Sequence, residues 1–255
     1  MVGQIAASWE LELGEPYAPG GQCAWVAPAG DDLVLKVGWR HREAEHEADA
    51  LRFWDGDAAV RCLAARSLED TTALLLERCV PGVQLKQSLP EPEQDVVIAG
   101  LMRRLWARQP SPGHPFGTLA EMCGLWADSL ELDSGAVDGG LVREAVALLR
   151  ELPGTSEGCV LLCTDLHAGN VLSARREPWL VIDPKPFLGD PAFEPVQHML
   201  NCDDRLASDP EALAARMAEL LELDAERVGL WLFARCAQES IHDLTMRETA
   251  RRLAP

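Results

Sequence analysis

The chain has 255 residues, of which 47% are hydrophobic and 25% charged, and its net charge is −18. This length is enough for a large buried core in one domain or two close lobes. The negative charge argues against nucleic acid as a partner, because a phosphate backbone would be repelled. It would attract a cationic small molecule, but solvated helix surfaces explain it as well, and we favour that second interpretation.

The sequence has no run of about 18 apolar residues, so neither a membrane span nor a membrane partner is expected. Its N-terminus has neither the basic region nor the long apolar core typical of a signal peptide. Eight cysteines are scattered without a paired Cys-x2-Cys spacing, so a zinc site is not expected. These features favour reduced thiols and a cytoplasmic location.

The first predicted strands contain a pair of glycines and a lysine. Gly20 and Gly21 lie in the stretch 19–26, which fits a turn that covers phosphates, although two adjacent glycines are also an ordinary hairpin signal. Lys36 interrupts the apolar run 33–37, where a lysine is costly to bury without a partner. We interpret it as a ligand of the α- and β-phosphates that pairs with a glutamate of the next helix. The alternative is an edge-strand lysine beside a solvated helix.

The next elements are predicted from apolar periodicity. A helix is expected over 41–54, on which Glu43 and Glu47 lie one turn apart. Residues 73–82 are an apolar strand that ends in Pro-Gly. From residue 83 the pattern is mainly helical, with helices expected over 91–108, 117–132 and 138–151 and two or three more over 210–253.

The most informative segment is Thr164-Asp165-Leu166-His167-Ala168-Gly169-Asn170, which lies between the predicted short strands 160–163 and 171–173. Asp183 ends a further apolar run thirteen residues after Asn170. This order suits phosphoryl transfer, in which one carboxylate orients the attacking hydroxyl and two groups carry the metal ion that bridges the phosphates. A turn rich in Asp and Asn, followed by a capping aspartate, is the competing interpretation. Pro184, which fixes the backbone directly after the carboxylate, weighs against it.

Together with the runs 176–186, 189–191 and 197–201, this segment resembles the catalytic core of the aminoglycoside phosphotransferase family, in the branch of streptomycin 6-phosphotransferases and hydroxyurea phosphotransferases. The resemblance extends from about residue 11 to the C-terminus and is strongest between 160 and 202. It implies an α+β, protein-kinase-like fold with two lobes, the first small and β-rich and the second larger and mainly helical. The implied parts are a nucleotide-binding lobe, a hinge, and a catalytic and acceptor-binding lobe, at residues 1–76, 77–82 and 83–255.

The resemblance also implies roles for single residues. It makes Asp165 the catalytic aspartate, Asn170 and Asp183 the Mg²⁺ ligands, and Glu47 rather than Glu43 the partner of Lys36.

The adenine of ATP would bind the backbone of the hinge between Glu77 and Val80, including Cys79. Relatives usually have His-Gly directly before the catalytic aspartate, where this chain has Cys163-Thr164. Because that histidine mostly supports the loop, the change concerns the packing of the loop more than its chemistry.

In kinase-like enzymes that act on small molecules, the acceptor site is lined by the C-terminal helices. The candidates here are Asp203, Asp204, Trp231, Glu239 and Asp243. Glu239 and Asp243 are four residues apart and would share a helix face, where they would hold a guanidinium or ammonium group beside the flat wall of Trp231. An exposed acidic helix face is the competing interpretation.

The sequence leaves open the identity of the acceptor, ATP against GTP, and monomer against homodimer. The expected activity is ATP- and Mg²⁺-dependent phosphorylation of a hydroxyl on a small molecule. A streptomycin-like aminoglycoside antibiotic or hydroxyurea is the expected acceptor, and its inactivation would give antibiotic resistance. The alternatives are a kinase of another small metabolite and a non-catalytic nucleotide-binding pseudokinase. The intact set of Lys36, Asp165, Asn170 and Asp183 argues against the pseudokinase.

Overall fold

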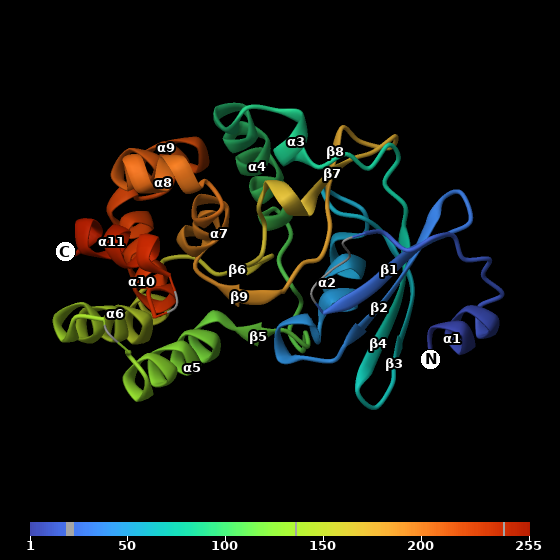
Figure 1. Cartoon of the computed structure of the whole chain (residues 1–255), viewed down its shortest axis with the longest axis horizontal. Coiled ribbons are helices and arrows are strands. Elements are labelled where there is room, and N and C mark those ends of the chain that lie inside the picture. Colours follow the sequence, from blue (N-terminus) through green and yellow to red (C-terminus); the bar gives the residue numbers. More distant parts are fainter. Residues whose placement is uncertain (19–22, 136, 242) are drawn as a thin grey trace. The chain divides into compact units, whose positions relative to one another are not determined.

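The computed structural model describes residues 1–18, 23–135, 137–241 and 243–255, and its elements are labelled in Figure 1. The predicted phosphate-covering glycines, Gly20 and Gly21, lie outside the described residues. The chain divides into two compact units. Unit 1 comprises Met1–Ser88 and Gly169–Lys185, and unit 2 comprises Leu89–Ala168 and Pro186–Pro255. Besides the residues of the predicted nucleotide-binding lobe, unit 1 therefore contains the segment Gly169–Lys185, which includes Asn170 and Asp183.

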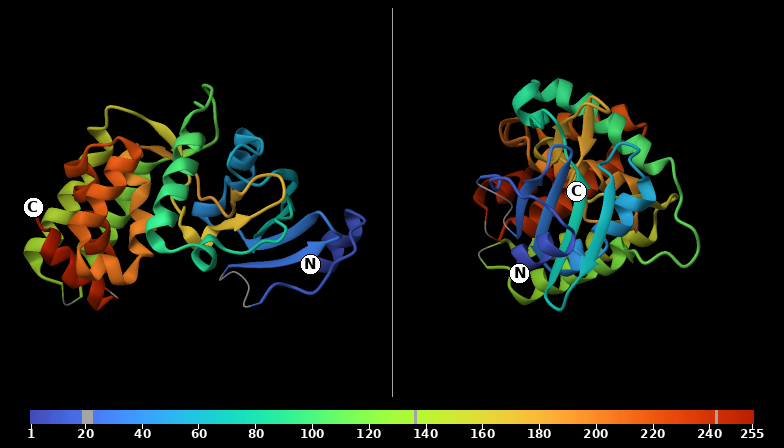
Figure 2. Two further views of the ribbon diagram at one scale, coloured as in Figure 1. Left: turned by 90° about the horizontal axis from the view of Figure 1, so that it is seen from above. Right: turned by 90° about the vertical axis from the view of Figure 1, so that its right-hand side faces the viewer.

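A four-stranded antiparallel sheet is the centre of unit 1. Its order is β1-β2-β4-β3, and the strands run side by side in blue and cyan in Figures 1 and 2. The strands are β1 (Ala24–Ala29), β2 (Leu33–Trp39), β3 (Cys62–Ser67) and β4 (Thr71–Glu77). Leu35 and Val37 of β2 and Ala73 of β4 are buried, and they share a core with Ile5 and Ala6. These last two residues belong to a helix that sequence periodicity did not predict, α1 (Val2–Ser8).

The predicted helix 41–54 is divided in the structure. A 3-10 turn covers Arg42–Ala44, and α2 covers Glu47–Trp54. Leu51 and Trp54 of α2 are buried. The helix ends where Asp55 adopts a left-handed conformation, with φ 49°, which stops the helical hydrogen bonding.

The second part of unit 1 is a short antiparallel hairpin of β7 (Val171–Ser173) and β8 (Trp179–Val181). The β8 strand pairs with the loop before β3, because Val60 N donates to Val181 O at 3.0 Å. The β7 strand pairs with the segment before α3 (Leu85–Ser88) through the bridge between Gln84 and Leu172. The hairpin is thus hydrogen-bonded to two separate parts of the first 88 residues.

Unit 2 is mainly helical, and its helices appear from green to red in Figures 1 and 2. They are α4 (Glu91–Trp106), α5 (Leu119–Leu132), α6 (Gly139–Glu151), α7 (Pro195–Leu200), α8 (Asp203–Ser208), α9 (Pro210–Leu221), α10 (Ala225–Glu239) and α11 (Leu244–Leu253). Asp138, Asp209, Asp224 and Asp243 accept hydrogen bonds from the first turns of α6, α9, α10 and α11. Such N-caps stabilise a helix by about 1 kcal/mol each, which explains why these helices begin where they do.

A small sheet in unit 2 has strands both before and after the catalytic segment in the sequence. It has the order β5-β9-β6, with β5 at Gly117–Thr118, β6 at Val160–Leu162 and β9 at Phe187–Gly189. A Cβ atom at Gly189 would collide with the side chain of Leu119. Only glycine therefore allows β9 to pack this closely against the start of α5.

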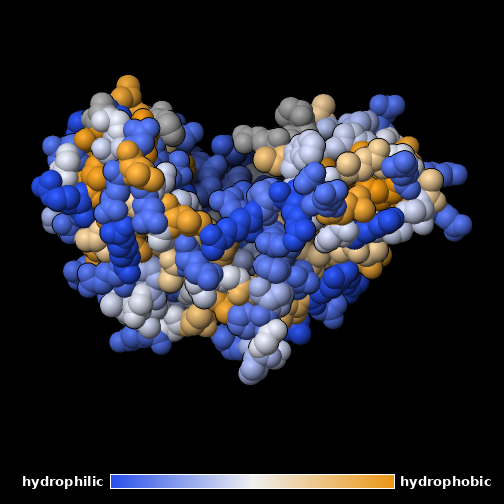
Figure 3. All heavy atoms as spheres, turned by 90° about the horizontal axis from the view of Figure 1, so that it is seen from below, coloured by the Kyte–Doolittle hydropathy of each residue, from blue (hydrophilic) through white to orange (hydrophobic). Residues whose placement is uncertain are grey.

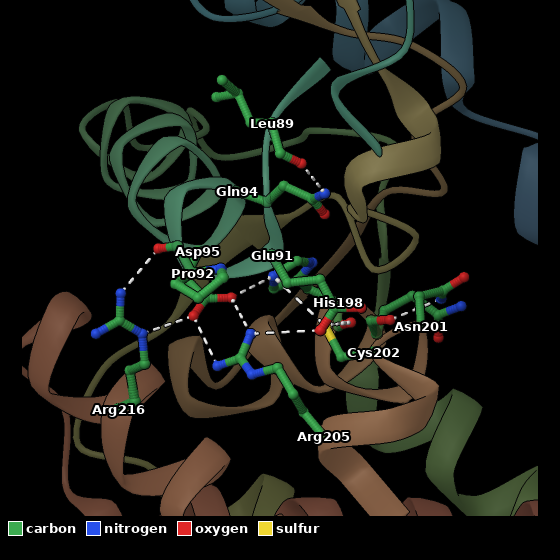
Figure 4. Close-up of polar contacts among 11 residues, drawn as sticks. Leu89, Glu91, Pro92, Gln94, Asp95, His198, Asn201, Cys202, Arg205 and Arg216 are labelled. Carbon is green, nitrogen blue, oxygen red and sulfur yellow. Dashed lines mark hydrogen bonds and ion pairs between the residues drawn. The ribbon is translucent and has the colours of Figure 1, made fainter. Parts of the chain in front are cut away.

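Four helices of unit 2 meet at one buried carboxylate (Figure 4). Asp95 of α4 accepts from Arg205 of α8 at 2.9 and 3.0 Å and from Arg216 Nε of α9 at 2.6 Å. His198 Nε2 of α7 lies 2.9 Å from Asp95 Oδ1. Burial alone would raise the pKa of Asp95, but these three partners outweigh it and hold the pKa well below its usual range.

Within the described ranges, no helix is long and apolar enough to cross a membrane. Large apolar side chains are exposed at single positions, such as Trp39, Leu132 and Leu244. On the face drawn in Figure 3, hydrophobic residues are scattered among hydrophilic ones, as is normal for a protein surface.

Candidate active site

Lys36 lies at the centre of an ion-paired group in unit 1. Its Nζ donates to both carboxylate oxygens of Glu47 at 2.7 Å and to Asp183 Oδ1 at 2.6 Å. The side chains of Lys36 and Glu47 are only 13% and 4% exposed. Burial alone would lower the pKa of Lys36, but the two carboxylates outweigh it and raise the pKa. The structure thus brings three predicted residues together, with the carboxylates of Glu47 and Asp183 around a lysine that stays charged. Glu43, the other candidate partner, lies in the preceding 3-10 turn.

Asn170 and Asp183 lie at the same end of the β7–β8 hairpin. Val171 pairs with Val181, and Ile182 N donates to Asn170 O at 2.9 Å. Asp183 follows directly with φ 54°, an uncommon conformation for a residue other than glycine and one that occurs at functional positions. Burial works to raise the pKa of Asp183, but the Lys36 ammonium lowers it. The hairpin end therefore offers an ionised carboxylate and a side-chain amide, which are oxygen ligands that Mg²⁺ accepts.

The predicted adenine-binding segment follows β4. Glu77 is the last residue of this strand, and Cys79 is buried behind it. Burial raises the pKa of the Cys79 thiol to about 12, so this thiol is not reactive at neutral pH. Arg78 N donates to Asp32 O at 2.8 Å and Gly82 N to Ser173 O at 3.0 Å, so both ends of the segment are tied to unit 1.

Asp165 follows β6 in a tight turn of unit 2. Its backbone N donates to Cys163 O at 2.8 Å. Thr164, between them, has φ 51°, which is a strained conformation for a β-branched residue. A glycine at position 164 would adopt this positive φ without that strain. The threonine therefore places backbone strain directly before Asp165.

A residue that sequence reasoning missed supports this turn. Glu194 is wholly buried, and its carboxylate accepts from Cys163 N at 2.8 Å and from Thr164 N at 2.9 Å. Burial raises the pKa of Glu194 to about 7, although the two backbone donors oppose this. The indication of a buried role that the sequence offers is that Glu194 is a single carboxylate within the otherwise apolar run Ala192–Val196.

The protonation of Glu194 should give activity and stability opposite pH dependences. An ionised carboxylate accepts both loop N–H groups, so kcat should fall as the pH drops below about 7. Because the folded state binds this proton more tightly than the unfolded chain, the free energy of unfolding should fall as the pH rises from about 4.5 to about 7. Glu194→Gln, with one acceptor oxygen, should lower kcat roughly tenfold at about pH 8. It should also flatten both profiles, measured by steady-state kinetics and urea unfolding. Wild-type profiles in this variant would contradict the role.

The predicted acceptor carboxylates are not gathered as expected. Asp203 and Asp204 lie in the exposed first turn of α8. Glu239 is the last residue of α10, where it accepts from Arg235 at 3.0 Å. Asp243 is the N-cap of α11. The prediction that Glu239 and Asp243 share one helix face is therefore wrong, because the helix ends between them.

Trp231 is fully buried in unit 2 and does not form an exposed wall. Its indole N–H donates to Asp190 Oδ2 at 2.7 Å, and its ring packs edge-on against Phe193 at 5.1 Å. Asp190 also accepts from Arg227 at 2.5 Å. The prediction that Trp231 contacts the substrate is therefore wrong. Trp231 is a core residue, because its indole N–H is hydrogen-bonded and its ring is packed in the interior of unit 2.

Asp95, His198 and Cys202 are residue types that bind metals, and one ligand atom of each lies within 4.8 Å of the others. Two features argue against a metal at this cluster. Arg205 and Arg216 already place two positive charges on the carboxylate, and burial raises the pKa of the Cys202 thiol to about 12. A cation would be repelled and would lack a thiolate, so we interpret the cluster as structural.

Comparison with known proteins gives matches along most of the chain. A family profile described as aminoglycoside/hydroxyurea antibiotic resistance kinase matches residues 18–244. A hydroxyurea phosphotransferase of Kitasatospora aureofaciens is 34% identical, with 98% of this chain and 74% of that protein covered. A streptomycin 6-kinase of Streptomyces griseus is 31% identical, with 96% and 82% covered. Among solved structures, the aminoglycoside phosphotransferase APH(3'')-Id of Streptomyces rimosus, bound to ADP and streptomycin, is 17% identical with a TM-score of 0.64, over 93% and 97% of the two chains.

Proposed function

The chain belongs to the aminoglycoside/hydroxyurea antibiotic resistance kinase family, and we propose that it transfers the γ-phosphoryl group of ATP to a hydroxyl of a small antibiotic-like molecule. The observation that carries this proposal is the ion-paired group of Lys36, Glu47 and Asp183. A buried lysine is costly unless it is paired. Here the pairing holds a permanent positive charge beside a candidate metal ligand, as a phosphate-binding site requires.

ATP and Mg²⁺ fit the donor set of unit 1. Lys36 would contact the phosphates, the oxygens of Asn170 and Asp183 would hold Mg²⁺, and the backbone from Glu77 to Val80 would hold the adenine. When bound there, Mg²⁺ would supply positive charge that offsets the negative charge developing on the phosphates. The ADP in the solved relative from Streptomyces rimosus supports the choice of nucleotide.

Unit 2 contributes Asp165, which we propose orients the acceptor hydroxyl. The hydroxyl oxygen would bond to the γ-phosphorus while the bond from that phosphorus to the β–γ bridging oxygen breaks and ADP leaves. The proton of the hydroxyl would pass to the Asp165 carboxylate. Glu194 would keep Asp165 in place through its hydrogen bonds to the preceding backbone, so the residues act mainly by positioning and charge stabilisation.

A streptomycin-like aminoglycoside or hydroxyurea is the proposed acceptor. The names of the relatives support these two compounds, and a net charge of −18 suits a cationic aminoglycoside. The reaction would take place in the cytoplasm and would inactivate the drug.

The test is incubation of the protein with Mg²⁺-ATP and each compound, followed by mass spectrometry of the acceptor. We expect one of them to gain the mass of a single phosphoryl group, and we expect no gain with Asp165→Ala. Transfer to neither compound, but to another hydroxyl compound of a metabolite panel, would reject the acceptor and keep the reaction. Binding of ADP without transfer to any acceptor would instead indicate a non-catalytic protein.

A further inference from the structure

Arg176, in the turn between β7 and β8, uses every N–H donor of its guanidinium group. Nε and Nη2 donate to the two carboxylate oxygens of Glu77 at 2.8 and 2.9 Å. Nη1 donates to Gly56 O at 2.6 Å and to Glu177 Oε1 at 2.9 Å, and Nη2 donates to Ala59 O at 3.0 Å. A guanidinium has five N–H donors in a fixed planar fork, so the surroundings of Arg176 match its full geometry.

The loop before β3 is shaped around this side chain. Asp55, Gly56 and Ala58 all have positive φ, at 49°, 84° and 61°, and these turns direct the carbonyls of Gly56 and Ala59 to Arg176. Two residues other than glycine in the left-handed region are uncommon in so short a stretch. The loop therefore accepts strain that the hydrogen bonds to Arg176 help to offset.

Glu77 is held as an ionised partner. Burial works to raise its pKa, but the hydrogen bonds from Arg176 and from Arg61 N outweigh this and lower it. The Arg176 and Glu77 side chains are only about one-fifth exposed, at 23% and 19%. A two-pronged pair with so little solvent contact is stronger and more directional than an exposed ion pair.

The hairpin that carries Arg176 also carries the candidate metal ligands at its other end. The far end of the segment 77–84 is attached to this hairpin as well, because Val83 N donates to Ser173 Oγ at 3.0 Å and Gln84 Nε2 to Gly169 O at 3.0 Å. Arg176 supplies the attachment at the near end, at Glu77. Both ends of the segment are thus hydrogen-bonded to the β7–β8 hairpin or its adjoining residues, and Asn170 and Asp183 lie at one end of that hairpin.

We propose that Arg176 is a positioning residue that couples the adenine-binding segment to the Mg²⁺-binding end of the β7–β8 hairpin, so that nucleotide and metal bind unit 1 cooperatively. The inference rests on the proposed nucleotide function. Loss of the Arg176–Glu77 pair detaches the near end of the segment from the β7–β8 hairpin, and the base and the metal ligands then adjust independently. Metal and nucleotide should strengthen each other's binding less, while each still binds.

The experiment measures the affinity for ADP by calorimetry, with saturating Mg²⁺ and with a chelator. The ratio of the two Kd values is the coupling factor, for which about 5- to 150-fold is typical. In Arg176→Met we expect this factor to fall toward 1, by up to about tenfold, with the Kd measured in chelator changing less than about threefold. Arg176→Lys should not restore it, because lysine keeps the charge but lacks the planar fork. A purely structural role would lower the melting temperature without changing the coupling factor.

Glu77→Gln removes the carboxylate charge of the same pair. It replaces Arg176→Met in the experiment if Arg176→Met does not fold. The double variant should have the same coupling factor as either single variant, because both substitutions remove the same Arg176–Glu77 interaction. Arg150→Met removes an exposed two-pronged arginine pair in unit 2 and should leave the coupling factor unchanged. Folded Arg176 and Glu77 variants with the wild-type factor would overturn the inference. A wild-type protein that binds no ADP would instead overturn the proposed function itself.

Discussion

Asp165→Asn should lower kcat by roughly 10²- to 10⁴-fold and leave the affinity for Mg²⁺-ADP close to that of the wild type. Asparagine keeps the size of the side chain, but it has no carboxylate to orient the hydroxyl and accept its proton. The loss should appear in kcat more than in KM, because the contact matters most in the transition state. Steady-state kinetics with the identified acceptor, together with calorimetry for ADP, measure the two effects separately.

The pH profile of the Asp165→Asn variant distinguishes loss of the Asp165 carboxylate from general damage to the loop. The negative charge of Asp165 contributes to raising the pKa of Glu194. Asp165→Asn should therefore move the acidic limb of the residual activity to lower pH. The matched control is Asp128→Asn, which removes a carboxylate from an exposed ion pair with Arg150, and its kcat should equal that of the wild type. Near-normal turnover in Asp165→Asn would show that another group orients the acceptor.

Asp95→Asn should have the largest effect on stability, about 3 to 5 kcal/mol in the free energy of unfolding. The substitution leaves the guanidinium groups of Arg205 and Arg216 beside a neutral side chain that cannot balance their charge. It also loosens the contact among α4, α7, α8 and α9. For a chain of this size the melting temperature should drop by roughly 10 °C, which differential scanning calorimetry measures.

The pH dependence of the wild type gives an independent check of Asp95. Because the folded-state pKa of Asp95 is lowered, its stabilising contribution is present above the unfolded pKa and is lost as the pH falls below about 4. In Asp95→Asn this part of the acid destabilisation should be missing. The matched control is Glu131→Gln, at an exposed partner of Arg150, which should change the melting temperature little. A loss below about 1 kcal/mol in Asp95→Asn would place the network among weak surface ion pairs.

Sequence was sufficient for the family, the enzyme class and the protein-kinase-like fold, which the comparisons confirm. The reason is local: the spacing of Asp165, Asn170 and Asp183 is fixed along the chain by a loop and a short hairpin. Strands β2, β4, β6, β7 and β8 and most helices were also predictable, since their apolar patterns are encoded in a few neighbouring residues.

Features that depend on distant partners were not predictable in this way. The side chain of Glu194 is defined by backbone donors about thirty residues earlier in the sequence, and that of Arg176 by carbonyls more than a hundred residues earlier. Trp231 was assigned to a surface because its hydrogen bond to Asp190 cannot be seen in the sequence. The spacing of Glu239 and Asp243 was interpreted as one helix, although Asp243 is a capping residue that begins the next.

Transfer of the γ-phosphoryl group to an acceptor can be measured with ATP that carries a labelled γ-phosphate, in a reaction with Mg²⁺ and either streptomycin or hydroxyurea. We expect the label to appear on the acceptor, one ADP to form for each phosphorylated acceptor, and Asp165→Asn to slow both by roughly 10²- to 10⁴-fold. Label released only as free phosphate, or no ADP formed in the presence of any hydroxyl acceptor, would contradict the assignment of this chain as a small-molecule kinase.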